Sequence, residues 1–245
     1  MLIYLETAAI AQSNHRVLDV GTKDGRHYVE NDAEAVGVDI DPKTPQRDIH
    51  MIKADGGQLP FPDNTFHIVV SNQVYEHLPQ ELRAAVTKDV ARVLSPDGVY
   101  LMSFSNRLFP FGNHGIGVPG FQWLPSVIRH WLTRYMLSEE DLEYHRDQLF
   151  YVSPTTVRPM LKDHFDRVEY CTATLGLRYG EVVWPTLVNR MWPFVVSTAV
   201  GRWFVELLFG YAAYVCWDST SGENAVSVGN NKLRERRLIR DSLGI

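Results

Sequence analysis

The chain has 245 residues, 45% of them hydrophobic, which suits a globular domain and excludes disorder, collagen and a disulfide-rich scaffold. Its 24 basic and 29 acidic side chains give a formal net charge of -5, so we expect no nucleic-acid partner. Two cysteines, Cys171 and Cys216, are predicted to be reduced, buried thiols. Residues 1–10 lack a basic segment and include Glu6, which argues against a secretory signal and predicts a cytoplasmic protein.

In the first half of the chain, short β-branched runs alternate with helical or polar stretches, as in a parallel sheet. The clearest helix is expected at residues 79–94, where Leu82, Val86 and Val90 share one face. Residues 41–48 contain two prolines and predict a loop where a crossover helix would otherwise lie. The predicted strands cover residues 16–20, 35–39, 49–55, 66–72 and 99–105.

The alternation stops after residue 105. Residues 106–150 are rich in aromatic residues and histidine and are expected to form an insertion over the sheet. A helix capped by Ser153 and shortened or kinked by Pro159 should follow. The remaining predictions are a strand at 167–175, an apolar helical insertion at 176–218, a last strand at 225–229 and a basic tail at 231–245.

Three predicted strands end in turns that suit an adenosyl ligand. The first runs into Gly-Thr-Lys-Asp-Gly at 21–25, where glycines permit a left-handed backbone and close approach of a nucleoside, although such glycines often only make the turn. The second ends at Asp39, which can accept hydrogen bonds from both ribose hydroxyls. The third leads to Asp55, which can accept one from the adenine amine. Carboxyl ends of parallel strands meet at one edge, so the three turns together predict a single site.

The chain resembles the class I S-adenosylmethionine-dependent methyltransferases, in the type 11 branch. The motifs that carry the resemblance are Asp-Val-Gly at 19–21, Leu-Pro-Phe-Pro-Asp-Asn-Thr-Phe at 59–66, Asn-Gln-Val-Tyr-Glu-His-Leu at 72–78 and Leu-Ser-Pro-Asp-Gly at 94–98. Residues 14–105 match well and 153–175 loosely. The resemblance implies one α/β domain over residues 1–245, three-layered and Rossmann-like. Its seven-stranded sheet would be mostly parallel, with the insertions after strand five and between strands six and seven.

The resemblance also implies S-adenosyl-L-methionine as the cofactor, with Asp19 and Gly21 near its methionine end, Asp39 on the ribose and Asp55 at the adenine. Lys23 stands where the family has a second glycine, so either the turn is reshaped or Lys23 points outward; it can also pair with the cofactor carboxylate. A dinucleotide pattern would match at only one of its three glycine positions. The predicted cofactor residues are Asp19, Gly21, Lys23, Gly25, Asp39, Ile40, Asp55, Gly56, Asn72 and Gln73.

Methyl transfer from a sulfonium needs alignment and exclusion of water, not a protein nucleophile. A hydroxyl acceptor requires a base, whereas a carboxylate acceptor requires none. His77 follows the fourth strand and is a candidate base, although it also suits the start of a helix. Asn106 and His114 are further candidates for contacting the acceptor. The scattered histidines give no metal-ligand spacing, so no metal site is predicted.

The expected lid at 106–150 holds rings that can grip a sugar or an apolar ring, although most should pack onto the sheet. Short motifs in it resemble methyltransferases of glycan and lipid-linked sugar pathways. We therefore expect O-methylation of a sugar or uronic acid in a glycan, free or lipid-linked. Methylation of a quinone or other apolar small molecule is the alternative enzyme function. A non-catalytic protein that binds the same cofactor is the alternative from another class.

The apolar segment at 184–217 is interrupted by Arg202 and Glu206, and its charge-free stretches fall short of the ~20 residues of a spanning helix. Four tryptophans in this segment can anchor a helical pair at the cytoplasmic face of a membrane. A homodimer interface and burial within the protein's own fold are the alternatives.

Overall fold

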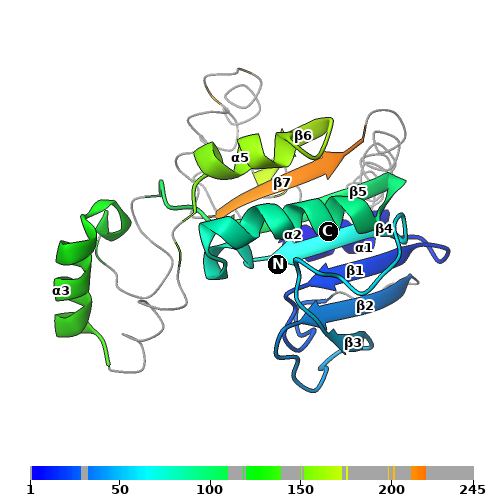
Figure 1. Ribbon diagram of the computed structural model, residues 1–245, viewed down its shortest axis with the longest axis horizontal. Helices are drawn as coiled ribbons and strands as arrows, with labels where there is room; N and C mark the ends of the chain where they lie inside the picture. Colours follow the sequence, from blue (N-terminus) through cyan, green and yellow to red (C-terminus); the bar gives the residue numbers. More distant parts are fainter. Residues whose placement is uncertain are drawn as a thin grey trace, which may run out of the picture.

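The computed structural model describes residues 2–28, 33–109, 118, 120–138, 150, 152–172, 175, 198, 201 and 211–218. A twisted central sheet lies between helices α2 and α5 on one face and helix α1 on the other (Figure 1). This arrangement confirms the predicted three-layer α/β architecture. Among the described residues, no helix is both long and apolar enough to cross a membrane.

The sheet has seven strands in the order β3-β2-β1-β4-β5-β7-β6. The pairs from β3 to β5 are parallel, whereas β7 runs antiparallel to both of its neighbours. The sheet is therefore mostly parallel, as predicted. The strands are β1 Arg16–Val20, β2 Glu34–Asp39, β3 His50–Lys53, β4 Phe66–Asn72, β5 Leu94–Ser105, β6 Arg167–Tyr170 and β7 Tyr211–Trp217.

Strand β7 corrects the prediction that the whole apolar segment at 176–218 is helical. Residues 212–217 are all buried between β5 and β6. An apolar run fits a strand covered on both faces as well as it fits a buried helix, so its periodicity could not separate the two. The strand predicted at 167–175 ends at Tyr170. The strand expected at 225–229, the tail at 231–245 and most of 184–210 lie outside the described residues.

Helix α2, Gln80–Val93, confirms the predicted helix, and residues 41–48 form a loop as expected. Helix α5, Pro154–Lys162, follows Ser153 and contains Pro159. Ser153 is the N-cap residue of this helix, as predicted, but its hydroxyl makes no capping hydrogen bond to the helix backbone and lies 2.7 Å from Thr155 Oγ1. Helix α1, Leu2–Ile10, was not predicted.

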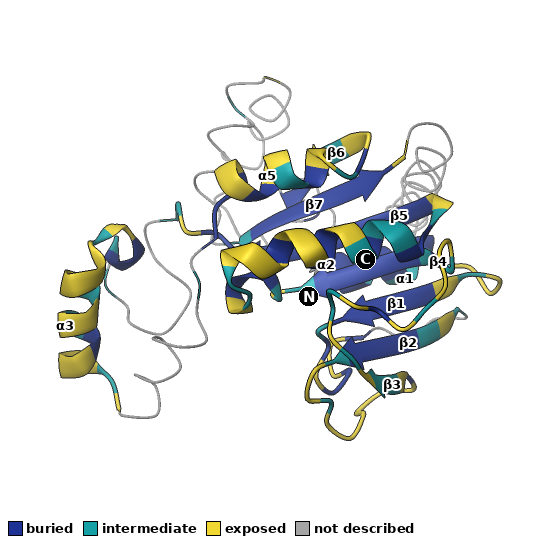
Figure 2. Ribbon diagram, viewed as in Figure 1, coloured by how far each residue is buried: buried dark blue, intermediate teal, exposed yellow. Residues whose placement is uncertain are grey.

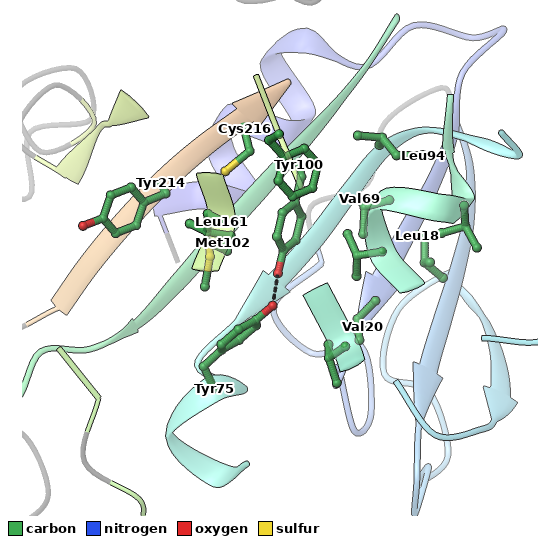
Figure 3. Packing of buried hydrophobic residues seen from close by; sticks show 14 of the residues in the cluster. Leu18, Val20, Val69, Tyr75, Leu94, Tyr100, Met102, Leu161, Tyr214 and Cys216 are labelled. Carbon is green, nitrogen blue, oxygen red and sulfur yellow. Dashed lines mark hydrogen bonds between the residues drawn. The ribbon is translucent and has the colours of Figure 1, made fainter. Parts of the chain in front are cut away.

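The core lies on both faces of the sheet. Between the sheet and α2, a chain of buried hydroxyls runs from Ser71 through Tyr100 to Tyr75, with oxygen distances of 2.7 and 3.3 Å. Figure 3 shows the contact between Tyr100 and Tyr75. The chain fixes the 3₁₀ turn η1, Tyr75–His77, against the ends of β4 and β5. Cys171 and Cys216 are buried free thiols, as predicted.

The described part of the insertion at 106–150 contains the turn η2, Phe121–Trp123, and helix α3, Ser126–Met136. Helix α3 stands apart from the sheet (Figure 1). Trp131 and Tyr135 on this helix are exposed, as is Trp123 before it (Figure 2). These three rings therefore depart from the expectation that most rings of the insertion pack onto the sheet, whereas Phe121 is buried.

Candidate active site

The structure brings the predicted cofactor residues to one edge of the sheet. Val20 pairs in register with Val38 on one side and with Ser71 on the other, so β1, β2 and β4 end at the same level. Asp39 and Asn72 are the last residues of β2 and β4. The geometry matches the expectation that parallel strands gather their carboxyl-terminal turns around one ligand.

Two glycines shape the turn after β1. Gly21 has a φ of 75°, and a Cβ there would lie 2.5 Å from Val74 Cγ2, so this position requires glycine for both backbone and space. Gly25 has a φ of 65° and is buried, with its missing Cβ 2.6 Å from Ile49 Cγ2. The structure thus gives Gly25 a packing role, while Gly21 lies at the edge where the ligand is expected.

Lys23 lies in the same turn, at the position where the family has a second glycine. Its φ of 59° is left-handed, which is the backbone that a glycine would adopt, and its side chain is exposed. Its backbone N–H donates to Asp39 Oδ2 at 2.8 Å, while the N–H of Asp41 donates to Oδ1 at 2.9 Å. Two backbone N–H groups therefore orient the Asp39 carboxylate. Each carboxylate oxygen can accept a further hydrogen bond from a ribose hydroxyl.

Asp19 is a buried carboxyl at the base of this turn. Its Oδ1 accepts a hydrogen bond of 3.1 Å from the Tyr4 hydroxyl. Its Oδ2 is also buried, with no hydrogen-bond partner among the residues that the structure describes. Burial raises the pKa of Asp19 to about 7, against the lowering effect of the nearby Thr22 and Tyr4 hydroxyls. An approaching cation would favour the ionised form and occupy the free oxygen.

The adenine side of the predicted site is open. Asp55 is exposed, and its Oδ1 accepts a hydrogen bond of 2.8 Å from the Gly57 N–H. Ile40 follows β2 and is 70% exposed, which is unusual for so large an apolar side chain at the end of a strand. At Gly56 a Cβ would lie 3.2 Å from Val20 Cγ1, so the turn packs tightly on β1. A carboxylate and an apolar side chain at one rim suit a base with an amine edge and a flat face.

The end of β4 offers amide groups. Asn72 Oδ1 accepts a hydrogen bond of 2.7 Å from Ser103 Oγ, which orients the Asn72 amide. Gln73 is exposed with a φ of 57°, and its N–H donates to the Ser103 carbonyl at 2.8 Å. Both predicted residues therefore lie at the edge of the sheet that carries Asp19.

Glu76 was not among the predicted site residues. It is a buried carboxyl that lies four residues after the end of β4. Its Oε1 accepts a hydrogen bond of 3.0 Å from the Ser105 N–H. Its Oε2 is buried with no partner in the described part of the chain. Burial raises the pKa of Glu76. The sequence offered a signal for it, since Glu76 directly precedes His77 in the motif after the fourth strand.

The predicted acceptor residues have different surroundings. His77 ends η1 and is exposed. Asn106 is buried, and its Oδ1 accepts a hydrogen bond of 2.9 Å from the Leu108 N–H, which gives it a turn-forming role. His114 lies outside the described residues. Within the described ranges, no three His, Cys, Asp or Glu side chains are grouped so that they could hold a metal ion.

Residues 18–102 match a family model described as a methyltransferase domain. An uncharacterised methyltransferase of Mycobacteroides abscessus is 31% identical over 146 residues, which are 54% of this chain and 55% of that protein. One of Mycolicibacterium gilvum is 29% identical over 161 residues, 58% of this chain and 56% of that protein. Residues 18–102 thus carry the match to a methyltransferase domain, in agreement with the class I resemblance of the sequence motifs. The chain spans about half the length of these curated relatives.

Solved structures agree with this methyltransferase fold. A phosphoethanolamine N-methyltransferase 2 of Haemonchus contortus, in complex with S-adenosyl-L-methionine, has a TM-score of 0.52 and 15% identity, covering 89% of this chain and 52% of that one. An S-adenosylmethionine-dependent methyltransferase of Mesorhizobium loti has a TM-score of 0.50 and 13% identity, covering 88% and 97%. At these identities the likeness concerns the fold alone.

The residues of the methyltransferase domain fit its cofactor, S-adenosyl-L-methionine. The orphaned Oδ2 of Asp19 suits the ammonium group of the methionine end. Asp39 suits the ribose, while Asp55 and Ile40 suit the adenine. The exposed Lys23 side chain leaves the turn open to such a ligand.

Proposed function

We propose that this protein transfers a methyl group from S-adenosyl-L-methionine to an oxygen of a sugar or uronic acid in a glycan, free or carried on a lipid. The observation that carries the methyltransferase part is the buried carboxyl of Asp19, which has one oxygen free at the base of the turn whose Lys23 N–H donates to Asp39. When bound, the cofactor supplies the methyl group and its leaving group. The protein must align the acceptor and exclude water.

Glu76 supports a hydroxyl acceptor. A hydroxyl must lose its proton as the new bond forms, and a carboxyl with a raised pKa accepts a proton more readily near neutral pH than an ordinary glutamate. The Ser105 N–H holds one carboxylate oxygen, which leaves the other to take that proton. His77, exposed at the end of the same turn, is the second candidate base.

The sugar acceptor is supported by Trp123, whose ring is 55% exposed. Its Nε1 donates to the Arg107 carbonyl at 3.0 Å, so the ring is held beside the chain that leaves β5. Flat, anchored aromatic faces suit sugar rings. A lipid-linked acceptor would place the enzyme at the cytoplasmic face of a membrane.

Calorimetric titration with S-adenosylhomocysteine tests the cofactor site without knowledge of the acceptor. We expect micromolar binding by the wild type and its loss in Asp39→Ala. Asp41→Ala is the matched control, because Asp41 lies in the same loop and its carboxylate pairs with Lys43 on the surface. No binding by the wild type, or equal binding by Asp39→Ala, would contradict the assigned site.

Transfer of a labelled methyl group then identifies the acceptor. Sugars, uronic acids and lipid-linked glycans are offered beside quinones. Transfer to a sugar oxygen supports the proposal, and transfer to quinones alone overturns its glycan part. Cofactor binding without transfer to any class would favour the non-catalytic alternative.

A further inference from the structure

Helix α3 exposes its large apolar side chains and buries a polar one. Val127, Trp131 and Tyr135 are spaced four residues apart and lie on one face, where they are 78%, 59% and 80% exposed. Thr133 on the other side of the helix is buried. Figure 2 shows the exposed face running along the helix on the side away from the sheet. A helix of an isolated soluble domain normally does the opposite, so this apolar stripe needs an occupant.

Burial of the polar Thr133 side chain costs little free energy. The Thr133 hydroxyl lies 3.0 Å from the carbonyl oxygens of Arg129 and His130 in the preceding turn, so its polar atom stays satisfied within the helix. The Trp131 and Tyr135 rings lie 5.3 Å apart, which makes the exposed stripe one continuous aromatic surface.

Charge identifies the occupant. Helix α3 contains two arginines and one histidine but no acidic residue, although the whole chain has a net charge of -5 and acidic residues follow at 139–141. By helical spacing, the cation Arg134 lies beside the apolar stripe, with the His130 ring next to it. Aromatic and aliphatic side chains bordered by cations are the pattern of a helix that lies in the plane of an anionic lipid surface. A second copy packed on this stripe across a twofold axis would bring cations against cations with no acid on the helix to offset them.

We propose that α3 docks on the surface of a bilayer that contains anionic lipids, with Val127, Trp131 and Tyr135 entering the headgroup region. The helix has 11 residues, too few to span a bilayer, so the contact is peripheral and reversible. The inference goes beyond the proposed function, because vesicle binding needs neither cofactor nor acceptor. Titration with the cofactor product measures the methyltransferase site separately, so the membrane proposal and the proposed function can each fail without the other.

Flotation of the full chain with vesicles tests the proposal. We expect binding to vesicles of equal parts phosphatidylcholine and phosphatidylglycerol, with affinity falling roughly tenfold or more on pure phosphatidylcholine. High salt should weaken the binding. The variant Trp131→Ser/Tyr135→Ser should bind at least about tenfold more weakly, and Arg134→Gln about fivefold.

Leu82→Ser is the matched control, because Leu82 is also a half-exposed apolar side chain but lies on α2. It should bind the mixed vesicles like the wild type. Equal affinity for both vesicle types, or undiminished binding by the double variant, would overturn the proposal. So would sedimentation showing a dimer that the double variant dissociates in a chain that binds no vesicles, since a second copy would then be the occupant.

Discussion

The Tyr4 hydroxyl donates a hydrogen bond to Asp19 Oδ1 across 3.1 Å and joins helix α1 to the strand that leads into the glycine turn. Both side chains are buried. Burial raises the pKa of Tyr4 well above its usual value, and the neighbouring Asp19 charge raises it further. Tyr4 therefore remains a donor at every relevant pH. It holds the Asp19 carboxyl in place and leaves only Oδ2 free for a ligand.

Tyr4→Phe should weaken binding of S-adenosylhomocysteine at pH 7 by roughly tenfold, because a hydrogen bond to a charged group contributes about 1.5 kcal/mol or more. Losing the donor raises the pKa of Asp19 further, so less of the carboxyl is ionised. The affinity should recover in part at pH 8.5. Calorimetry at both pH values measures the effect. An affinity equal to that of the wild type at pH 7 would show that Tyr4 has no influence on this site.

Asp19 should also make the stability of the protein depend on pH. Its pKa is about 7 in the folded chain against a usual 3.8, so the folded state holds the proton more tightly between these values. Stability from this group is therefore greatest below pH 4, declines as pH rises to 7 and is constant above. Asp19→Asn should remove a decline of roughly 2 kcal/mol in the free energy of unfolding between pH 5 and 8.

Urea unfolding of the wild type and Asp19→Asn at both pH values measures that decline. The difference between the two proteins isolates Asp19 from other titrating groups. An identical pH dependence in both would mean that Asp19 does not titrate as assigned.

Glu76→Gln should lower the rate of methyl transfer to a hydroxyl acceptor by about a hundredfold, because the amide cannot take the proton. The glutamine keeps an oxygen for the Ser105 N–H, so the fold and S-adenosylhomocysteine binding should persist. Glu81→Gln on the exposed side of α2 is the matched control and should transfer at the wild-type rate. A fully active Glu76→Gln would leave Glu76 with a structural role only, and His77 as the base to examine.

Much of the sheet followed from the sequence because β1, β2 and β4 are short apolar runs that end in Asp, Gly or Asn, a pattern with few alternatives. The apolar run at 211–217 was harder, because a strand buried on both faces carries no periodicity to separate it from a helix. The exposed face of α3 could not be predicted, because residue spacing shows that a helix has an apolar stripe without showing where it faces.

The candidate site divides in the same way. Asp39 and Asn72 end their strands and Asp55 lies two residues after β3, so local pattern and topology were enough to bring them to one edge of the sheet. The contact between Tyr4 and Asp19 joins segments whose pairing no local motif encodes. The apolar spacing of Ile3 and Ile10 was the available signal for helix α1, and it says nothing of which side chain reaches the carboxyl.

Lys23 and Gly21 both have a left-handed backbone in the same turn, but their substitutions should affect stability differently. Lys23→Gly relieves about 1 kcal/mol of backbone strain but makes the unfolded chain more flexible by a similar amount, so the free energy of unfolding should change by less than about 0.5 kcal/mol. Gly21→Ala instead adds strain and forces a Cβ to within 2.5 Å of Val74, which should destabilise the fold by roughly 2 kcal/mol. Urea unfolding separates these outcomes. Because the Lys23 side chain is exposed, Lys23→Gly should keep S-adenosylhomocysteine affinity within about twofold; a loss greater than tenfold would mean that the lysine does pair with the cofactor carboxylate.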